Sequence, residues 1–328
     1  MNIVLTIDTN FAPQAAACIA SVCENNKDVS SISFFILTTG IKEPAGKKLH
    51  TLVESYDRTL DIIDIGNIYQ YFDSDFDTAG WSEIILARLL MARFLPVSVS
   101  RVLYLDGDTI VRRSLSPLWN TDLDSNLIGA VREPTASAER RKALHIADMR
   151  YFNSGVLLID LDSWRSNSIE KTLLDYCRNH KAVLFASDQD AINGALATRI
   201  KELSPSYNYV NSFFYYPYSA LVRMCRPAQY ISRENYEAAI ADPTIVHFLG
   251  EERPWRAGNT HQYRSDYAHY LSLTPFSNMP MEQGWETYFK AWRTFNTATK
   301  PFPMLRYRII TSLIPTFMRF RAAKRRRT

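Results

Sequence analysis

The sequence predicts an α/β protein with a mostly parallel β-sheet covered by helices, and three observations support this fold class. Short apolar, β-branched segments alternate with segments of helical period through the first two thirds of the 328-residue chain. Apolar residues make up 46% of the chain and aromatic residues 12%, which suffices for a large core and excludes a disordered protein. The chain has only 11 Gly and 15 Pro, which excludes a collagen-like or low-complexity design.

The expected elements follow one another in a βαβ order. Strands are expected at residues 3–7, 32–37, 60–65, 102–105, 155–160 and 245–248, and helices at 13–24, up to about 55, 82–94, 169–179 and after 187. Pro96 ends the helix predicted over 82–94. Ser187 is expected to cap the last of these helices, with Asp188 and Asp190 in its first turn.

Charge is unevenly distributed along the chain. The 38 basic and 34 acidic residues give a net charge of +4, but residues 306–328 hold eight cations and no acid. These cations are Arg306, Arg308, Arg319, Arg321, Lys324, Arg325, Arg326 and Arg327. Subtracting them from the total leaves −4 for residues 1–305, so an acidic body and a basic tail need separate explanations.

Cysteine spacing and the N-terminus predict a cytoplasmic protein. Four cysteines, Cys18, Cys23, Cys177 and Cys225, have no metal-ligand spacing, so we interpret them as free thiols in a reducing compartment. The chain starts without the basic and apolar regions of a secretory signal. No apolar run reaches the ~18 residues of a spanning helix, so any membrane contact is expected to be peripheral.

Two carboxylates follow the strand expected at 102–105. Asp106 and Asp108 flank Gly107, and residues two apart in extended backbone project to the same side, so both can reach one hard cation. Gly107 would let a bulky ligand such as a diphosphate approach the backbone. An Asp-x-Asp triplet also occurs in ordinary turns, so the motif alone leaves a metal site and a local turn as alternatives.

His247 lies near the end of the strand expected at 245–248, and Gly250 and Arg253 follow this strand. The imidazole could complete a coordination sphere, and Arg253 could neutralise a phosphate that approaches the backbone at Gly250. The alternative is a half-buried histidine followed by a proline turn.

Three further polar clusters stand at element ends. Asn153 and Ser154 precede a buried strand and suit sugar hydroxyls. Residues 187–190 are polar and lie at the start of a helix, where capping alone would also explain them. At residues 8–11, Asp8 and Asn10 could read a base edge on which Phe11 stacks, or form a turn.

Taken in their order along the chain, these motifs resemble those of the family 8 retaining glycosyltransferases. This group contains bacterial lipopolysaccharide galactosyl- and glucosyltransferases and, more distantly, glycogenin. The resemblance spans about residues 1 to 260 and implies a single GT-A type, Rossmann-like nucleotide-binding domain with a mixed, mostly parallel sheet. A small helical C-terminal region would follow. We therefore expect a catalytic domain at 1–260, an aromatic, helical extension at 261–303 and a basic amphipathic tail at 304–328.

The resemblance also implies roles for individual residues. The metal ligands would be Asp106, Asp108 and His247. Donor contacts would come from Asp8, Asn10, Phe11, Arg88, Asp106, Asn153, Ser154, Asp188, Gly250 and Arg253. Gln189 would lie near the anomeric carbon, with Asp188 and Asp190 in support, and Glu133 would lie near the acceptor. Phe11 stands where the family usually has Tyr, and Arg253 where it usually has Lys, which keeps the charge.

The expected reaction is metal-dependent transfer of galactose or glucose from a UDP-sugar to a saccharide. Two carboxylates and an imidazole favour Mn²⁺ as the cofactor, with Mg²⁺ as the nearest competitor. Retention could arise by front-face attack or by double displacement, and Gln189 as a poor nucleophile favours the first. A catalytically silent nucleotide-sugar-binding subunit of a glycan assembly complex is the alternative function.

The basic tail has helical period. Its apolar residues fall near one face between flanking arginines, namely Ile309, Ile310, Leu313, Ile314, Phe317 and Met318. Such a helix suits an anionic membrane surface, which predicts attachment to the inner face of the cell membrane and a lipid-linked acceptor. Packing on the domain is the alternative, and no nucleic-acid recognition motif is present.

Overall fold

The computed structural model describes residues 1–72, 78 and 82–325. The strands are β1 Asn2–Thr6, β2 Ser33–Thr38, β3 Thr59–Asp64, β4 Arg101–Leu105, β5 Thr109–Val111, β6 Ile128–Arg132, β7 Phe152–Asp160, β8 Ile200–Leu203 and β9 Ile245–His247. The α-helices are α1 Ala12–Glu24, α2 Glu43–Glu54, α3 Met91–Phe94, α4 Ser116–Trp119, α5 Ala138–Ala143, α6 Leu161–Ser166, α7 Ile169–His180, α8 Ser187–Leu196, α9 Asn211–Tyr215, α10 Tyr218–Cys225, α11 Arg233–Ala241, α12 Arg264–Ser272, α13 Glu286–Thr299 and α14 Pro303–Arg325. Short 3₁₀ helices occupy Thr9–Phe11, Ile68–Tyr71, Glu83–Leu89, Ala197–Arg199 and Pro205–Tyr207.

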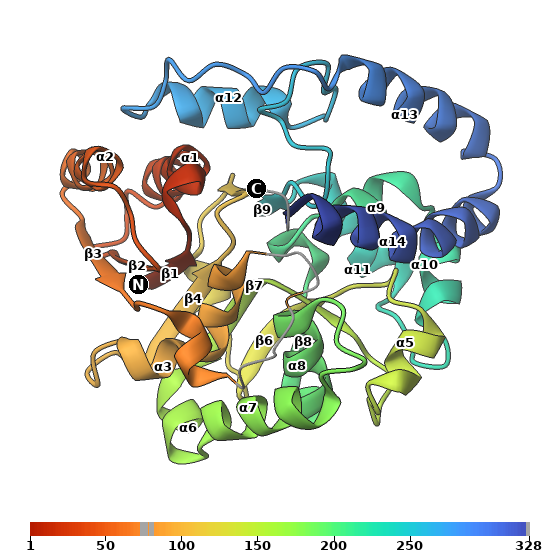
Figure 1. Ribbon diagram of the computed structural model, residues 1–328, viewed down its shortest axis with the longest axis horizontal. Helices are drawn as coiled ribbons and strands as arrows, with labels where there is room; N and C mark the ends of the chain where they lie inside the picture. Colours follow the sequence, from red (N-terminus) through yellow and green to blue (C-terminus); the bar gives the residue numbers. More distant parts are fainter. Residues whose placement is uncertain (73–77, 79–81, 326–328) are drawn as a thin grey trace.

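A mixed sheet of seven strands forms the centre of the molecule (Figure 1). Its order is β3-β2-β1-β4-β7-β6-β8, and a separate pair joins β5 to β9. Neighbours run parallel except β7, which is antiparallel to both β4 and β6. The predicted architecture is therefore confirmed: an α/β fold with a mixed, mostly parallel sheet and a helical C-terminal region.

Each face of the sheet carries its own core. Successive strand residues alternate between the two cores, as extended backbone requires: Leu103 and Leu105 face one core, while Val102 and Tyr104 face the other. Helices α1 and α2 cover the first face, and α6, α7 and α8 cover the second (Figure 1). Burial on both faces explains why the central strands read as continuous apolar runs.

Three strands and several helices differ from the sequence expectations, since α4, α5, α6, α9, α10 and α11 were not expected either. The strands β5, β6 and β8 were not expected, because they are short and carry glycine or polar residues. The helix expected over 82–94 is instead a 3₁₀ helix, Glu83–Leu89, followed by the short α3. The four cysteines are free thiols, as expected, and all four are buried.

The expectation that Ser187 caps a helix is wrong. Helix α8 includes Ser187, and the cap position is Ala186, whose side chain cannot accept a hydrogen bond. Asp190 performs the capping function from inside the first turn: its Oδ2 accepts from the backbone N–H groups of Phe185, at 2.7 Å, and Ala186, at 2.8 Å. Asp188 and Asp190 lie in the first turn as predicted.

The C-terminal helices pack on the body. Helix α12 lies on the side of α1 away from the sheet, where Asn25 donates a hydrogen bond to the hydroxyl of Tyr270 at 2.8 Å (Figure 1). Arg306, one of the cations counted in the tail, is only 2% exposed and belongs to this packed region. Among the described residues, no helix combines the length and the apolar character needed to cross a membrane. Arg326 and Arg327 lie outside the described residues.

Candidate active site

Two strand pairings bring Asp106, Asp108 and His247 together. Asp106 directly follows β4, and its N–H donates to the carbonyl of Gly155 on β7 at 2.8 Å. Strands β5 and β9 are antiparallel with Thr109 opposite His247, and the N–H of Phe248 donates to the carbonyl of Asp108 at 2.9 Å. Residues some 140 positions apart therefore meet because two short strands pair.

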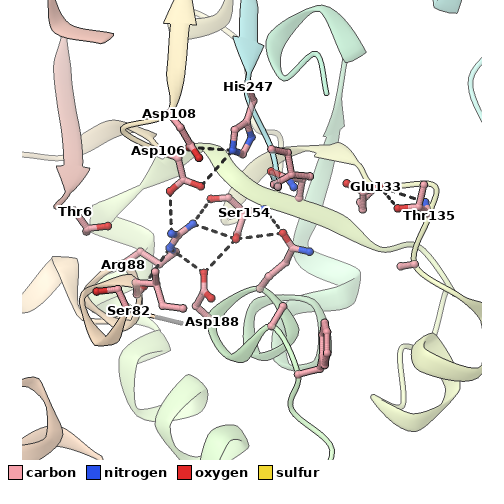
Figure 2. A pocket seen from close by; sticks show the side chains of 18 of the residues that line it. Thr6, Ser82, Arg88, Asp106, Asp108, Glu133, Thr135, Ser154, Asp188 and His247 are labelled. Carbon is pink, nitrogen blue, oxygen red and sulfur yellow. Dashed lines mark hydrogen bonds and ion pairs between the residues drawn. The ribbon is translucent and has the colours of Figure 1, made fainter. Parts of the chain in front are cut away.

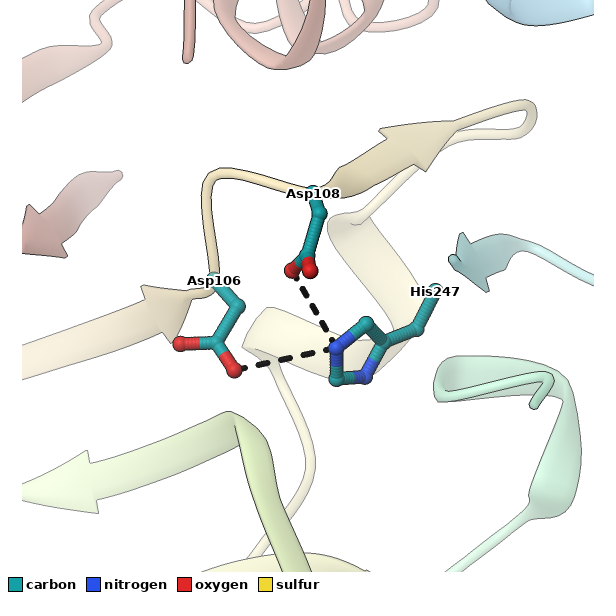
Figure 3. Close-up of side chains that lie close together, drawn as sticks. All are labelled: Asp106, Asp108 and His247. Atoms are coloured by element: carbon teal, nitrogen blue, oxygen red, sulfur yellow. Dashed lines mark ion pairs between the residues drawn. The ribbon is translucent and has the colours of Figure 1, made fainter. Parts of the chain in front are cut away.

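The three side chains converge on one point (Figure 3). One ligand atom from each residue lies within 4.8 Å of the others. His247 Nε2 lies 3.2 Å from Asp108 Oδ1 and 3.7 Å from Asp106 Oδ2. The imidazole is 1% exposed, and its Nε2 has no hydrogen-bond partner. A buried polar atom without a partner is costly, and a cation held by these three ligands would satisfy it.

A hydrogen bond between His247 Nδ1 and Asn208 fixes the tautomer of the imidazole. Asn208 donates its amide N–H to Asn153 Oδ1 at 2.8 Å, which leaves Asn208 Oδ1 to accept from His247 Nδ1 at 3.0 Å. With the proton on Nδ1, the lone pair of Nε2 is free to bind a metal. The carboxylates oppose the burial that would otherwise lower the pKa of His247, and the net pKa is raised.

Gly155 makes room for this arrangement. A Cβ built at Gly155 would lie 2.3 Å from Cε1 of His247 and 2.8 Å from Oδ2 of Asp106. No side chain fits between them. Gly107 serves a different neighbour, because its nearest contact is the ring of Phe11, where a Cβ would lie 3.0 Å from Cδ1.

Arg88 connects the carboxylate motif to Ser154 and Asp188 (Figure 2). Its guanidinium donates to Asp106 Oδ1 at 2.9 Å, lies 2.9 Å from Asp188 Oδ2, and donates to the carbonyl of Ser154 at 2.8 Å. Burial alone would lower the pKa of Arg88, but the charges of Asp106 and Asp188 outweigh it. Arg88 is 4% exposed and lines the cavity. Its contacts hold Asp106, Asp188 and Ser154 in place.

Gln189 is held by a chain of hydrogen bonds. Its Oε1 accepts from the N–H of Ser154 at 3.0 Å, and its amide donates to the hydroxyl of Tyr151 at 3.1 Å. Tyr151 in turn donates to Asp190 Oδ1 at 2.7 Å, and Asp190 also forms an ion pair with Arg140. Asp190 is fully buried and does not line the cavity. It therefore supports Gln189 indirectly, through its hydrogen bond with Tyr151.

The other end of the site combines aromatic and cationic groups. The ring of Phe11 meets Trp255 edge to face at 6.0 Å, and the guanidinium of Arg253 lies 5.6 Å from the Phe11 centroid. Arg253 Nη2 also lies 3.8 Å from Asp108 Oδ2. Asp8 Oδ1 accepts from the backbone N–H of Asn10 at 2.9 Å. Asn10 itself is exposed and does not line the cavity.

A single cavity of about 580 Å³ contains most of the predicted residues (Figure 2). The predicted residues that line it are Asp8, Phe11, Arg88, Asp106, Asp108, Glu133, Asn153, Ser154, Asp188, Gln189, His247, Gly250 and Arg253. Thr311, Ile314 and Pro315 from α14 also line it. This contribution was not predicted, and neither were the roles of Asn208, Tyr151 and Arg140, which no local motif marks, nor the role of Gly155 in leaving room for His247.

Gly250 shapes the rim of this cavity. It follows β9 with φ +78°, a left-handed conformation that glycine adopts without strain. Its carbonyl accepts from Arg253 Nε at 3.0 Å, which holds the guanidinium over the site. Gly250 and Arg253 therefore form one turn at the cavity edge.

The fold and this site together define a GT-A type transferase. A sequence profile described as Glycosyl transferase family 8 matches residues 2–258, and the chain belongs to this family. It is a glycosyltransferase by that membership.

Known relatives agree with this assignment. General stress protein A from Bacillus subtilis is 28% identical over 85% of this chain and 96% of its own. A lipopolysaccharide 1,2-glucosyltransferase from Escherichia coli K12 is 24% identical, covering 78% of this chain and 72% of its own. The galactosyltransferase LgtC, solved in complex with donor and acceptor sugar analogs, superposes with a TM-score of 0.72 at 25% identity, covering 84% of this chain and 96% of LgtC.

Proposed function

We propose that this chain is a metal-dependent retaining hexosyltransferase that moves galactose or glucose from a UDP-sugar to a saccharide acceptor. One observation carries the proposal: a buried imidazole nitrogen without a partner faces Asp106 and Asp108 inside the cavity. Membership in family 8 and the likeness to LgtC supply the reaction class. The remaining lining residues suit the parts of a nucleotide sugar.

The three candidate ligands fit a hard divalent cation with tolerance for one nitrogen. Mn²⁺ accepts carboxylate oxygens and an imidazole together, Mg²⁺ is the nearest competitor, and an all-oxygen site would be expected for Ca²⁺. The bound cation would neutralise the charge that develops on the diphosphate leaving group. Arg253 lies close enough to Asp108 to add a second positive charge at the same place.

The residues around Gln189 favour front-face attack. A double displacement needs a free carboxylate nucleophile, but Asp190 is buried and bonded to Arg140 and Tyr151, while Asp188 is paired with Arg88. In front-face attack the acceptor oxygen bonds to the anomeric carbon on the side from which the diphosphate leaves, and the hydroxyl proton passes to the departing phosphate oxygen. Gln189, fixed by Ser154 and Tyr151, would stabilise the positive charge on the sugar.

Glu133 is the candidate acceptor residue. It lines the cavity, and its Oε1 accepts from the N–H of Thr135 at 3.2 Å and from the Thr135 hydroxyl. Burial raises its pKa, partly offset by these hydrogen bonds. In Figure 2, Glu133 and Thr135 lie apart from the network around Arg88, as expected for an acceptor end separate from the donor end.

A lipid-linked acceptor and peripheral attachment to the inner face of the cell membrane complete the proposal. On α14, Leu305 and Leu313 are 51% and 57% exposed, and Arg308 is exposed beside them. Apolar and cationic side chains together suit an anionic lipid surface. Arg306 is buried, so it cannot contact lipid and does not count among the cations of the tail that could.

The catalytic proposal is tested by Asp106→Asn. With UDP-galactose or UDP-glucose and Mn²⁺, the wild-type protein should release UDP, and the variant should lose at least about 100-fold of that rate. Asp124→Asn, on an exposed surface loop, is the matched control and should keep it. Undiminished turnover of the wild type in a metal chelator would contradict metal dependence. Absence of UDP release with either donor would favour the silent subunit.

Membrane attachment is tested by Leu313→Asp. The wild-type protein should co-sediment with phosphatidylethanolamine–phosphatidylglycerol vesicles and much less with phosphatidylcholine vesicles. The variant should lose binding to both while keeping UDP release. Equal partitioning of the two proteins would remove α14 as the attachment element.

A further inference from the structure

We propose that the inner face of α14, formed by Thr311, Ile314 and Pro315, is the acceptor-side wall of the catalytic cavity and contacts the saccharide acceptor directly. The proposal rests on the proposed transferase function. It assigns to one helix two faces with different partners: the acceptor on the inside and the membrane surface on the outside.

The inner face continues the established cavity. The family profile ends at residue 258, and every other residue that lines the cavity lies at or before Arg253. Thr311, Ile314 and Pro315 therefore add a wall that the shared catalytic domain does not contain. Figure 1 shows α14 returning from α13 toward β9, the strand that carries His247.

Arg306 fixes the start of α14 against the body. Its guanidinium lies 4.3 Å from the ring centroid of Tyr215 on α9 and 5.1 Å from that of Trp292 on α13. Its Nη1 donates to Thr299 Oγ1 at 3.2 Å. A cation between aromatic faces with its stem buried is a stable anchor, so α14 is held in place one turn before the cavity.

Tyr307 identifies the part of the cavity that α14 approaches. Burial raises the pKa of Tyr307, the hydrogen bond with Thr311 and the charge of Arg141 lower it, and the charges of Glu139 and Glu133 raise it. Glu139 and Arg141 belong to α5, and Glu133 belongs to the segment between β6 and α5. The same segment supplies Glu133, Thr135, Ala136 and Ser137 to the cavity, so α14 lies beside the candidate acceptor residue.

The chemistry of this wall predicts which part of the acceptor it meets. Ile314 and Pro315 offer apolar surface, whereas Glu133 and Thr135 on the facing segment offer hydroxyl partners. We expect the acceptor to turn its less polar ring face or its lipid-proximal part toward α14. An outward row on the same helix, Leu305 and Leu313, would then keep the enzyme at the surface where such an acceptor resides.

Two neighbouring residues of α14 with different surroundings give a matched test. Ile314 lines the cavity at 38% exposure, while Leu313 faces solvent at 57%. The full-length Ile314→Ala and Leu313→Ala proteins would be assayed with radiolabelled UDP-galactose and UDP-glucose and a detergent-solubilised glycolipid extract from the native host. Ile314→Ala should raise the apparent KM for the extract about 10-fold, as for lost contacts in an apolar pocket. The KM for the acceptor should change more than the KM for the donor, which separates contact with the acceptor from general damage to the cavity.

Leu313→Ala should leave the acceptor KM unchanged and weaken only vesicle binding. Equal effects of the two variants on the acceptor KM would assign Ile314 to membrane contact and overturn the proposal. Ile314→Trp, which fills the cavity, should raise the acceptor KM more than Ile314→Ala, and its retained donor turnover would report a folded protein. Wild-type acceptor kinetics in both Ile314 variants would also overturn it. Failure of the wild-type protein to release UDP would instead refute the proposed function itself.

Discussion

The imidazole of His247 packs directly on the backbone of Gly155, so that a Cβ at this glycine would lie 2.3 Å from Cε1. We predict that Gly155→Ala displaces both His247 and Asp106, because the new methyl group would also lie 2.8 Å from Asp106 Oδ2. The affinity for Mn²⁺ should fall by at least about 10-fold, as for other disturbances of ligand orientation. Calorimetric titration of the purified protein with Mn²⁺ measures this directly.

Gly46→Ala is the matched control for that experiment. Gly46 lies in α2, and a Cβ there would meet its nearest atom at 3.6 Å, an ordinary contact. Alanine is about 1 kcal/mol better than glycine inside a helix, so this variant should be at least as stable as wild type and bind Mn²⁺ equally. Equal Mn²⁺ affinity in both variants would show that the close packing at Gly155 is not needed.

Asn208 should control the metal affinity without touching the metal. It accepts from His247 Nδ1 and donates to Asn153, which holds the imidazole in one tautomer. Asn208→Ala should weaken Mn²⁺ binding by about 10- to 100-fold. Asn26→Ala, which removes another fully buried asparagine bonded to the N–H of Leu115, should lower stability but leave Mn²⁺ affinity intact. A similar loss of affinity in both variants would point to general destabilisation.

Local sequence pattern predicted much of the fold. Continuous apolar runs identified β1, β2 and β4, because both faces of each central strand are buried. The pattern failed for β8, where Lys201 and Glu202 are half-buried on an edge strand, and for β5, which has three residues. Such strands exist because a neighbour pairs with them, and that information is not local.

The candidate site was likewise predicted only in part from local sequence pattern. Asp106, Asp108 and His247 were recognisable because they follow strands, and strand ends gather at one edge of a sheet. Asn208 was not, because a single asparagine in a loop carries no pattern. Helical period predicted the tail helix, but the burial of Arg306 depends on rings from α9 and α13 that only the folded chain assembles. Which face of α14 meets the body therefore could not be predicted.

Asp190 should act on stability and on the position of Gln189 rather than as a nucleophile. Its carboxylate is fully buried and bonded to Arg140, Tyr151 and two backbone N–H groups. Removing one partner of a buried ion pair costs about 3–5 kcal/mol, so Asp190→Asn should unfold at clearly lower urea concentration and lose part of its activity. Mass spectrometry of wild-type protein incubated with donor should find no glycosyl adduct. An adduct on Asp190, with complete inactivity of the variant, would establish double displacement instead.

His261 should make the fold sensitive to mild acid. It accepts from the N–H of Tyr263 through Nδ1 and donates through Nε2 to Asn211 Oδ1, and burial lowers its pKa to about 4. Because the unfolded chain binds this proton near pH 6.5, stability is full above that pH and falls by up to about 3 kcal/mol as pH drops toward 4. Urea unfolding between pH 8 and 4 measures the loss. His261→Gln, which does not titrate, should flatten this part of the profile. An equally steep fall in the His261 variant would assign the acid sensitivity to other groups.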